Sequence, residues 1–353
     1  MDPVRAQYEA LPYPARDPAD EAHRLVEGSP SHPVEIDHFV FGGRRDWSRP
    51  FRALVAGGGT GDALVMLAQK LADIRCPAEI VYLDLSEASR AVAEARIAAR
   101  GLSGVRFVTA DLAEAPALGP FDYIDCCGVL HHLPDPDAGF AALSEALAEG
   151  GGIGLMVYAP YGRTGVYAMQ EAFAMLLGQD PPAERVRLAR PVVEALPETN
   201  WLRRNPLVGD HRDSDAGLHD LLLHARDRAY AVEALLAALA RAGLGLVSML
   251  EPRRYDPREY LPPGPDMAKR VRGLEPAARM GLAERLAGNM KTHVAYAVKA
   301  DRAPAPGPAG WRVPPAREAA DVAHLALDPR GLARHLGKHG EIRAALDGLT
   351  HRV

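Results

Sequence analysis

The stretch that most constrains this chain is a short apolar run that turns through glycines into a helical pattern. It extends from Phe51 to Asp62 with the sequence FRALVAGGGTGD, and an apolar periodic segment, Ala63 to Leu71, follows it. A strand, a tight turn and a helix in this order are typical of the start of an α/β nucleotide-binding domain. Glycine suits such a turn because a Cβ would block a close approach of the backbone to a ligand. The helix N-terminus behind the turn would offer free N–H groups to an anionic group.

The spacing of these glycines separates two classes of cofactor. Gly57, Gly59 and Gly61 form the pattern G-x-G-x-G, whereas the dinucleotide fingerprint needs a glycine where this chain has Asp62. An acidic side chain at that position would repel a pyrophosphate. The spacing therefore argues against an NAD-dependent oxidoreductase, and a tight turn without a ligand is the plainest alternative.

Strand-like and helix-like segments alternate regularly between residues 51 and 158. The expected strands cover 51–56, 79–84, 105–108, 121–127 and 153–158, and the expected helices cover 62–73, 87–100 and 136–148. We expect the glycines at 150–152 to stop the last of these helices. Repeated βα units predict an α/β fold with a parallel sheet, helices on both faces, and ligands at the carboxyl ends of the strands.

The remaining segments divide the chain into further parts. Residues 1–50 are rich in proline and predict an N-terminal arm or lid rather than one long helix. The regular pattern breaks at 159–229, a helical insertion expected to cover the substrate, and returns at 230–300 with a helix and two strands. A second insertion is expected at 252–289. Residues 303–353 are expected to form a proline-rich linker and a helical tail.

Composition argues against nucleic acid and membranes as partners. The net charge of −5 creates no positive field that would attract either of them. No apolar run approaches the roughly twenty residues of a membrane span, and no signal peptide opens the chain. Cys76, Cys126 and Cys127 show no metal-ligand spacing and are typical of reduced thiols. We therefore expect a cytoplasmic protein.

Acidic residues end two further strands at the edge where ligands would bind. Asp84 ends the second expected strand, 23 residues after Gly61, where a carboxylate can accept both hydroxyls of an adenosine ribose. Asp111 ends the third strand, where its side chain can accept from an adenine amino group while the backbone N–H of Leu112 donates to the ring. A solvent-facing acid or a helix cap is the alternative for each carboxylate.

Taken together, these motifs resemble the class I S-adenosylmethionine-dependent methyltransferases. The matching segments are LVAGGGTG at 54–61, LDLS at 83–86, FVTADL at 107–112, FDYI at 121–124, GVLHHLPDP at 128–136 and LAEGGG at 147–152. The resemblance is specific over 51–158 and looser over 230–299. It implies a Rossmann-like fold with a seven-stranded, mostly parallel sheet, a core formed by 51–158 and 230–300, and S-adenosyl-L-methionine as the cofactor.

The resemblance also implies which residues bind the cofactor. These are Gly57, Gly58, Gly59, Gly61, Asp84, Leu85, Asp111, Leu112, Cys127, Tyr8 and Tyr13. The glycines would pass under the methionine part, and Cys127 would lie beside the methionine amine and the reacting methyl. Tyr8 and Tyr13 belong to a piece that resembles arms folded over the cofactor in some bacterial members. One departure matters: Val55 stands two residues before the first glycine, where the family usually has an acid.

Fewer sequence motifs indicate which residues bind the methyl acceptor. His224, Tyr158 and Tyr161 are the expected catalytic residues. His224 belongs to a polar cluster in the first insertion, whose alternatives are a substrate pocket, a metal site and a solvated surface: Asp210, His211, Asp213, Asp215, His219, Asp220 and His224. His219 and His224 do not share a helix face, and no metal-ligand motif accompanies them, so no metal is expected. The pair His131–His132 is expected to anchor a loop at the edge of the site.

We therefore predict a methyltransferase that acts on an oxygen or nitrogen atom of a small molecule by in-line displacement. Three alternatives stay open: a protein or peptide substrate, S-adenosylmethionine itself as a substrate cyclised through its aminobutyrate arm, and a binding module without catalysis. The sulfonium is already a good electrophile, so a general base is needed only if the acceptor starts protonated. Nothing in the sequence specifies the oligomeric state.

Overall fold

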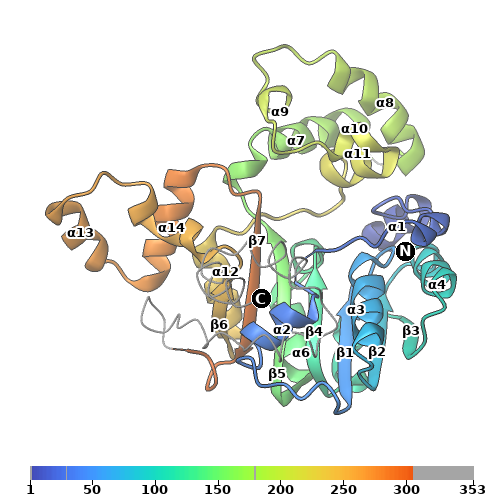
Figure 1. The fold of residues 1–353 in the computed structure, drawn as a ribbon. Helices are drawn as coiled ribbons and strands as arrows, with labels where there is room; N and C mark the ends of the chain where they lie inside the picture. The colour runs from blue at the N-terminus through green and yellow to red at the C-terminus, as the bar shows by residue number, and fades with distance from the viewer. Residues whose placement is uncertain (1, 29, 179, 305–353) are drawn as a thin grey trace.

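The centre of the molecule is a seven-stranded sheet with the strand order β3-β2-β1-β4-β5-β7-β6 (Figure 1). The computed structural model describes residues 2–28, 30–178 and 180–304. The strands are β1 (Phe51–Ala56), β2 (Ala78–Asp84), β3 (Val105–Thr109), β4 (Phe121–Cys127), β5 (Leu147–Tyr158), β6 (Leu244–Met249) and β7 (Thr292–Lys299). Only β7 runs antiparallel to its neighbours, β5 and β6. The expected Rossmann-like, mostly parallel sheet is confirmed.

Alternate residues of the strands pack against helices on opposite faces of the sheet, as the period of a strand requires. Ala53 and Val55 share a core with α2 (Pro33–Phe39), α3 (Asp62–Asp73) and α4 (Glu87–Ala99). Leu54 and Ala56 share a core with α5 (Ala115–Leu118), α6 (Pro136–Glu145) and α12 (Val232–Arg241). The two cores hold the sheet rigid, so its carboxyl edge is a fixed platform.

The N-terminal segment packs on this platform through one buried ion pair, Arg96–Glu21, and through half-buried pairs to Asp62. It contains α1 (Pro3–Ala10) and a short 3-10 helix at Pro18–Ala22. Arg96 of α4, only 1% exposed, donates to Glu21 Oε1 and to Asp62 Oδ1, both at 2.7 Å. Arg16 donates to both oxygens of Asp62 at 2.8 and 2.6 Å. Since breaking a buried pair leaves an uncompensated charge, these contacts fix the arm against α3 and α4.

The first insertion forms a helical layer over the carboxyl edge of the sheet, on the side where α1 lies (Figure 1). Its helices are α7 (Val166–Leu177), α8 (Pro182–Glu194), α9 (Trp201–Arg204), α10 (Asp210–Asp213) and α11 (Asp215–Leu222). Residues of α7, α8, α9 and α11, among them Phe173, Leu218 and Leu222, form a separate apolar cluster. The second insertion contains α13 (Pro265–Arg272) and α14 (Pro276–Ala287).

Short 3-10 turns complete the chain. They lie at Leu112–Glu114, Leu130–His132, Tyr161–Arg163, Pro252–Tyr255 and Pro257–Glu259. Among the residues that the structure describes, no helix has both the length and the apolar character to cross a membrane.

One local expectation is wrong. Helix α6 ends at Glu145, and the glycines at 150–152 lie inside β5 instead of stopping the helix. A Cβ on Gly151 would lie 2.6 Å from the Phe121 carbonyl oxygen, so the glycines permit close approach to β4, where the register shifts. The polar stretch before Asp220 forms α10 and α11, and α11 is buried on most of its length. The expected tail beyond residue 304 lies outside the described residues.

Candidate active site

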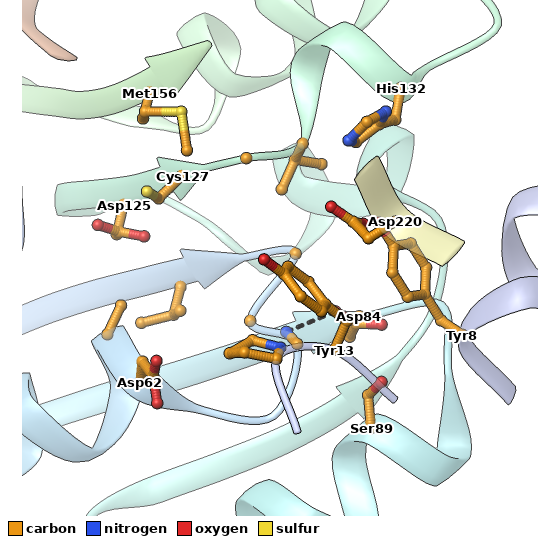
Figure 2. Close-up of a pocket in the computed structure, with 18 of the residues that line it drawn as sticks. Tyr8, Tyr13, Asp62, Asp84, Ser89, Asp125, Cys127, His132, Met156 and Asp220 are labelled. Carbon is orange, nitrogen blue, oxygen red and sulfur yellow. Dashed lines mark hydrogen bonds between the residues drawn. The ribbon is translucent and has the colours of Figure 1, made fainter. Parts of the chain in front are cut away.

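A cavity of about 770 Å³ lies at the carboxyl ends of β1, β2, β4 and β5. The N-terminal segment, the glycine turn and the first insertion contribute its walls (Figure 2). Its volume falls within the range of small-molecule and cofactor sites. The parallel sheet therefore presents a ligand site at the edge where its topology predicts one.

The glycine turn forms the floor of the cavity beside Asp84. Gly57 and Gly59 adopt positive φ angles of 69° and 51°, which side chains other than glycine rarely tolerate. Asp84 Oδ2 accepts the backbone N–H of Gly59 at 2.8 Å, and Oδ1 accepts that of Ser86 at 2.9 Å. Burial raises the pKa of Asp84, while these N–H groups oppose the shift. The carboxylate is thus held in place with acceptor capacity left for a ribose.

The predicted adenine contacts lie at the next strand end. Leu85, Asp111 and Leu112 all line the cavity. The Asp111 side chain accepts the backbone N–H of Ala113 at 2.8 Å and so also caps the following turn. The helix-cap alternative and the cofactor role are compatible here, because a carboxylate has more than one acceptor site.

The arm brings its tyrosines over the glycine turn. Thr60 Oγ1 donates to the Pro14 carbonyl oxygen at 2.7 Å, and a Cβ on Gly59 would lie 3.0 Å from the Tyr13 carbonyl oxygen. Figure 2 shows the Tyr13 ring in the cavity between Asp84 and the end of β4. Tyr8 lines the cavity from α1. Both predicted arm residues therefore reach the site.

The end of β4 contributes Asp125 and Cys127 to the same cavity. Burial raises the pKa of the Cys127 thiol, so this side chain stays neutral. Asp125 is 2% exposed, and one of its oxygens accepts the Ser31 hydroxyl. Burial raises the pKa of Asp125 to about 6. The sequence argument did not single out this carboxylate.

A buried polar cluster faces the cavity from the insertion side. Asp220 of α11 accepts the Tyr8 hydroxyl at 2.9 Å and the Tyr158 hydroxyl at 3.3 Å. Burial raises the pKa of Asp220 to about 7, although the Tyr8 hydrogen bond lowers it. The Arg163 guanidinium lies 3.6 Å from the centroid of the Tyr158 ring and pairs with Asp227 at 2.7 Å. The cavity therefore contains a carboxyl group that can exchange a proton near neutral pH.

Two of the expected catalytic residues lie behind this wall or away from it. His224 does not line the cavity: its Nε2 is 3.1 Å from the Tyr8 hydroxyl, and its Nδ1 accepts the Arg226 backbone N–H at 3.0 Å. Burial lowers the pKa of His224 well below its usual value, so the ring is neutral. Tyr161 lies outside the cavity, with Arg285 over its ring. Tyr158 is the expected catalytic residue that reaches the site.

Gly61 also stands apart from the cavity. Its φ is 98°, and a Cβ there would lie 3.0 Å from that of Ala93. This glycine therefore allows α3 to approach α4, whereas the other glycines of the turn line the ligand site. In the polar cluster of the insertion, Asp213 and Asp215 are exposed, while His219 and Asp220 are buried.

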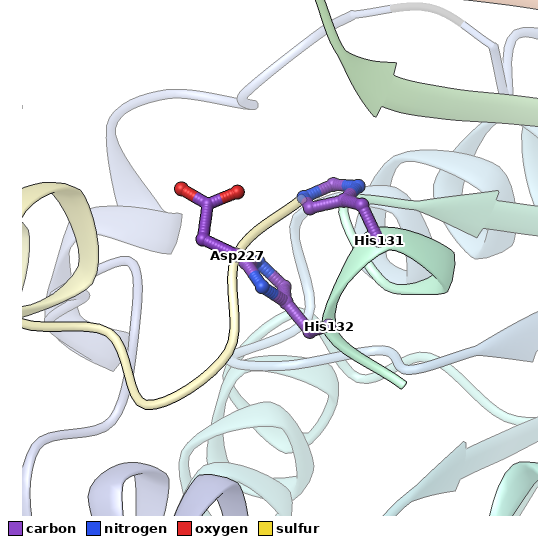
Figure 3. Close-up of side chains that lie close together, drawn as sticks. All are labelled: His131, His132 and Asp227. Carbon is purple, nitrogen blue, oxygen red and sulfur yellow. The ribbon is translucent and has the colours of Figure 1, made fainter. Parts of the chain in front are cut away.

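Two groups of three side chains bring metal-ligand atoms within 4.8 Å of one another in the part of the chain that the structure describes. They are His131, His132 and Asp227, shown in Figure 3, and His132, Asp220 and His224. Arg163 already occupies Asp227 Oδ2, and its positive charge would repel a cation. Since His224 Nδ1 accepts an N–H, the ring proton lies on Nε2, the nitrogen nearest Tyr8. Hydrogen bonds and an ion pair therefore already occupy several of the atoms that would bind a metal ion. A site without a metal ion stays our prediction.

Comparison with known proteins identifies the class. A family model described as a methyltransferase domain matches residues 54–153. The protein syc1184_c of a Synechococcus strain is 32% identical over 297 residues, which cover 80% of this chain and 68% of that protein. The structure of PKMT2 from Rickettsia typhi in complex with AdoHcy has a TM-score of 0.58 at 14% identity, covering 77% of this chain and 54% of that one. The chain thus spans about half the length of that structure.

The chain belongs to the class I S-adenosylmethionine-dependent methyltransferases, and S-adenosylmethionine is its cofactor. The cavity fits this assignment, because positive-φ glycines cradle it and a half-buried carboxylate, Asp84, lies where the ribose is expected. The assignment sets aside an NAD-dependent oxidoreductase and a binding module without catalysis.

Sequence reasoning missed three groups in the cavity wall. Asp220 was noted only within a polar cluster, Asp125 only within a strand, and Arg163 not at all. The usable signal for Asp125 was an acid in the middle of an apolar strand, since a carboxylate is rarely buried without a purpose. Asp220 gave no local signal, because its partner Tyr8 lies 212 residues away in the sequence.

Proposed function

We propose that this methyltransferase acts on an oxygen or nitrogen atom of a small molecule bound in the cavity, with Asp220 as the general base. The observation that carries the proposal is the position of Asp220: it lines the cavity, is 3% exposed, and has a pKa raised by burial to about 7. A carboxyl group in this state takes a proton efficiently at neutral pH. An acceptor that starts protonated needs such a group.

Neighbouring side chains orient this carboxylate. The proton on His224 Nε2 is directed to the Tyr8 oxygen, so the Tyr8 hydroxyl must point its own hydrogen at Asp220 Oδ1. Tyr158 donates to the other oxygen. Asp220 is therefore held in one orientation, and His224 acts through Tyr8 as a positioning residue rather than as the base.

The transfer then needs little else from the protein. S-Adenosylmethionine supplies a methyl group on a sulfonium, which is already electrophilic. When the acceptor atom takes the methyl group from the sulfonium sulfur, leaving S-adenosylhomocysteine, the Asp220 carboxylate would take the proton of the acceptor. The glycine turn and Asp84 would hold the nucleoside end, and the arm with the first insertion would keep water away, which strengthens the electrostatic effects in the site. A covered cavity of about 770 Å³ suits a cofactor with a compact acceptor.

A protein substrate is the second candidate, favoured by one observation. Met175, Leu176 and Trp201 of the first insertion are 89%, 63% and 64% exposed. Where such exposed apolar side chains adjoin one another, they can form a surface that contacts another polypeptide. In that case the residue to be methylated would enter the same cavity.

The experiment separates these candidates by the size of the labelled product. The protein is incubated with methyl-labelled S-adenosylmethionine and with a cell lysate divided by ultrafiltration into small molecules and macromolecules. We expect label to move to compounds of the filtrate, and the transfer to be lost in Asp220→Asn. Label only in retained protein would replace the small-molecule proposal with the second candidate. Label that stays on a released thionucleoside would indicate cyclisation of the cofactor itself.

A further inference from the structure

The resemblance implies an acid on the first strand that supports the cofactor's amino group; this chain lacks it there, but the neighbouring strand carries a carboxylate at the same level. β1 carries Val55 two residues before the first glycine. β4 pairs with β1 in parallel, and Val55 is in register with Asp125. Paired residues of neighbouring strands project to the same face, and adjacent strands lie about 4.8 Å apart. The carboxylate is thus displaced by one strand and kept on the same face of the sheet.

Asp125 is a buried carboxylate in the cavity wall whose hydrogen-bond partners are neutral groups, so a cationic group of a ligand would stabilise it. It lines the cavity, and Val55 and Cys127 line the cavity beside it. Its hydrogen bonds come from the Ser31 hydroxyl and the Cys127 backbone N–H, both neutral groups. Among the described residues, no lysine, arginine or histidine forms an ion pair with it. A buried carboxylate without a cation is costly, because burial removes its hydration and two hydrogen bonds from neutral groups replace that hydration only in part.

The order of the strands places this carboxylate at the correct end of the cofactor. The predicted adenine contacts lie at β3, the ribose contact Asp84 at β2, and the glycine turn at β1, so the next strand, β4, borders the amino-acid end. Figure 2 shows Asp125 and Cys127 on one side of Tyr13 and Asp84 on the other. The amino-acid end of S-adenosylmethionine carries an α-ammonium group, the cation that Asp125 lacks.

We propose that Asp125 binds the α-ammonium group of S-adenosylmethionine and replaces the acid absent from β1, with Ser31 of the N-terminal segment holding the carboxylate in position. The inference rests on the cofactor assignment and is independent of the identity of the acceptor. It gives the N-terminal segment a role in cofactor binding through Ser31, in addition to covering the site.

The test compares two ligands that differ in the group concerned. S-Adenosylmethionine and 5′-methylthioadenosine share the adenosine, but only the first carries the amino acid and a positive charge on the sulfur. S-Adenosylhomocysteine carries the same amino acid on a neutral sulfur, so its affinity should fall in Asp125→Asn as much as that of S-adenosylmethionine if the ammonium group is the partner. Titration calorimetry with Asp125→Asn should show affinity for S-adenosylmethionine lower by roughly ten- to a hundredfold, the effect of losing a charge-assisted contact, with affinity for methylthioadenosine unchanged. The matched control is Asp122→Asn, the same change at the opposite end of β4, which should leave both affinities as they are.

A measurement on the unmodified protein gives the same test without a substitution. Four titratable groups are coupled electrostatically to Asp125, namely Tyr123, Tyr296, Cys126 and Cys127, and burial raises the pKa of each, so they stay neutral in acid. Asp62 and Asp220 line the same cavity: the pKa of Asp62 is lowered, so it stays charged, and Asp220 lies across the cavity from Asp125 in Figure 2. Burial raises the pKa of Asp125 to about 6. The ratio of the two affinities should therefore fall as the pH is lowered from 7 to 5, while any effect of Asp84 cancels because both ligands share the ribose.

Three outcomes would overturn the inference. Equal losses for the two ligands in Asp125→Asn would make the residue structural. Unchanged affinity for S-adenosylmethionine, or a ratio independent of pH, would leave the ammonium group without this partner. A failure to bind S-adenosylmethionine in the unmodified protein would instead remove the cofactor assignment itself, so the two failures are distinguishable.

Discussion

Replacing Asp220 by asparagine tests the proposed base through two independent quantities. The carboxamide keeps the shape of the carboxyl group and can still accept from Tyr8, but it cannot take a proton. Removal of a general base typically lowers the rate by 10²- to 10⁴-fold. Activity of the unmodified protein should rise with pH through about 7 as Asp220 ionises, and the residual activity of the variant should lack this rise.

The same substitution should stabilise the protein at high pH. The pKa of Asp220 rises from 3.8 to about 7 on folding, so the folded state binds a proton more tightly than the unfolded state. The contribution of Asp220 to the free energy of unfolding is therefore fully present in acid and is lost as the pH rises from about 4 to 7. At 1.36 kcal/mol for each pKa unit, the loss is about 4 kcal/mol at most. Asparagine mimics the protonated form, so its advantage should be near zero at pH 4 and a few kcal/mol at pH 8.

The assay is urea unfolding at both pH values together with a pH profile of methyl transfer. Asp215→Asn is the matched control, because Asp215 begins the same helix and its side chain is 64% exposed. The control should change neither the activity nor the pH dependence of stability by a comparable amount. Full activity in Asp220→Asn, or a stability change that is the same at both pH values, would refute the assignment of Asp220 as a buried base.

Three further substitutions test other parts of the site. Asp84→Ala should weaken S-adenosylmethionine binding by about 1.5–3 kcal/mol in calorimetry through loss of a bidentate contact, and unchanged affinity would refute the ribose assignment. Tyr8→Phe removes a hydrogen bond that lowers the pKa of Asp220, so the pH profile of activity should shift to higher pH; a profile that does not move would contradict the cluster. Arg16→Ala removes both hydrogen bonds to Asp62, so trypsin should cleave the N-terminal segment faster and cofactor should dissociate several-fold faster in stopped flow; unchanged proteolysis would show that the arm is held by other contacts.

Most of the fold could be predicted from local patterns in the sequence. The βα alternation, the glycine turn and the acids at the ends of β2 and β3 depend on residues within a few positions of one another, since strand and helix periods and turn preferences act over that range. The error at β5 has the same origin. Three consecutive glycines usually stop a helix, and only the backbone of β4 beside them shows that they lie within a strand.

The acceptor side of the site depended on contacts that no local pattern records. Asp220 faces the cavity because α11 packs in the insertion and Tyr8 returns from the other end of the chain, and burial by both is what raises its pKa.

What the sequence determined by itself is the sheet, the class of cofactor and the carboxylate at the end of β2, because each follows from neighbours along the chain. What only the tertiary structure decided is which charges are buried together. Asp125 lines the cavity at the end of β4, in register with Val55, and Asp220 lines it from helix α11 of the first insertion. The pKa of each carboxyl group is raised because burial removes water from it, and this burial arises only when segments distant in the sequence pack around the group.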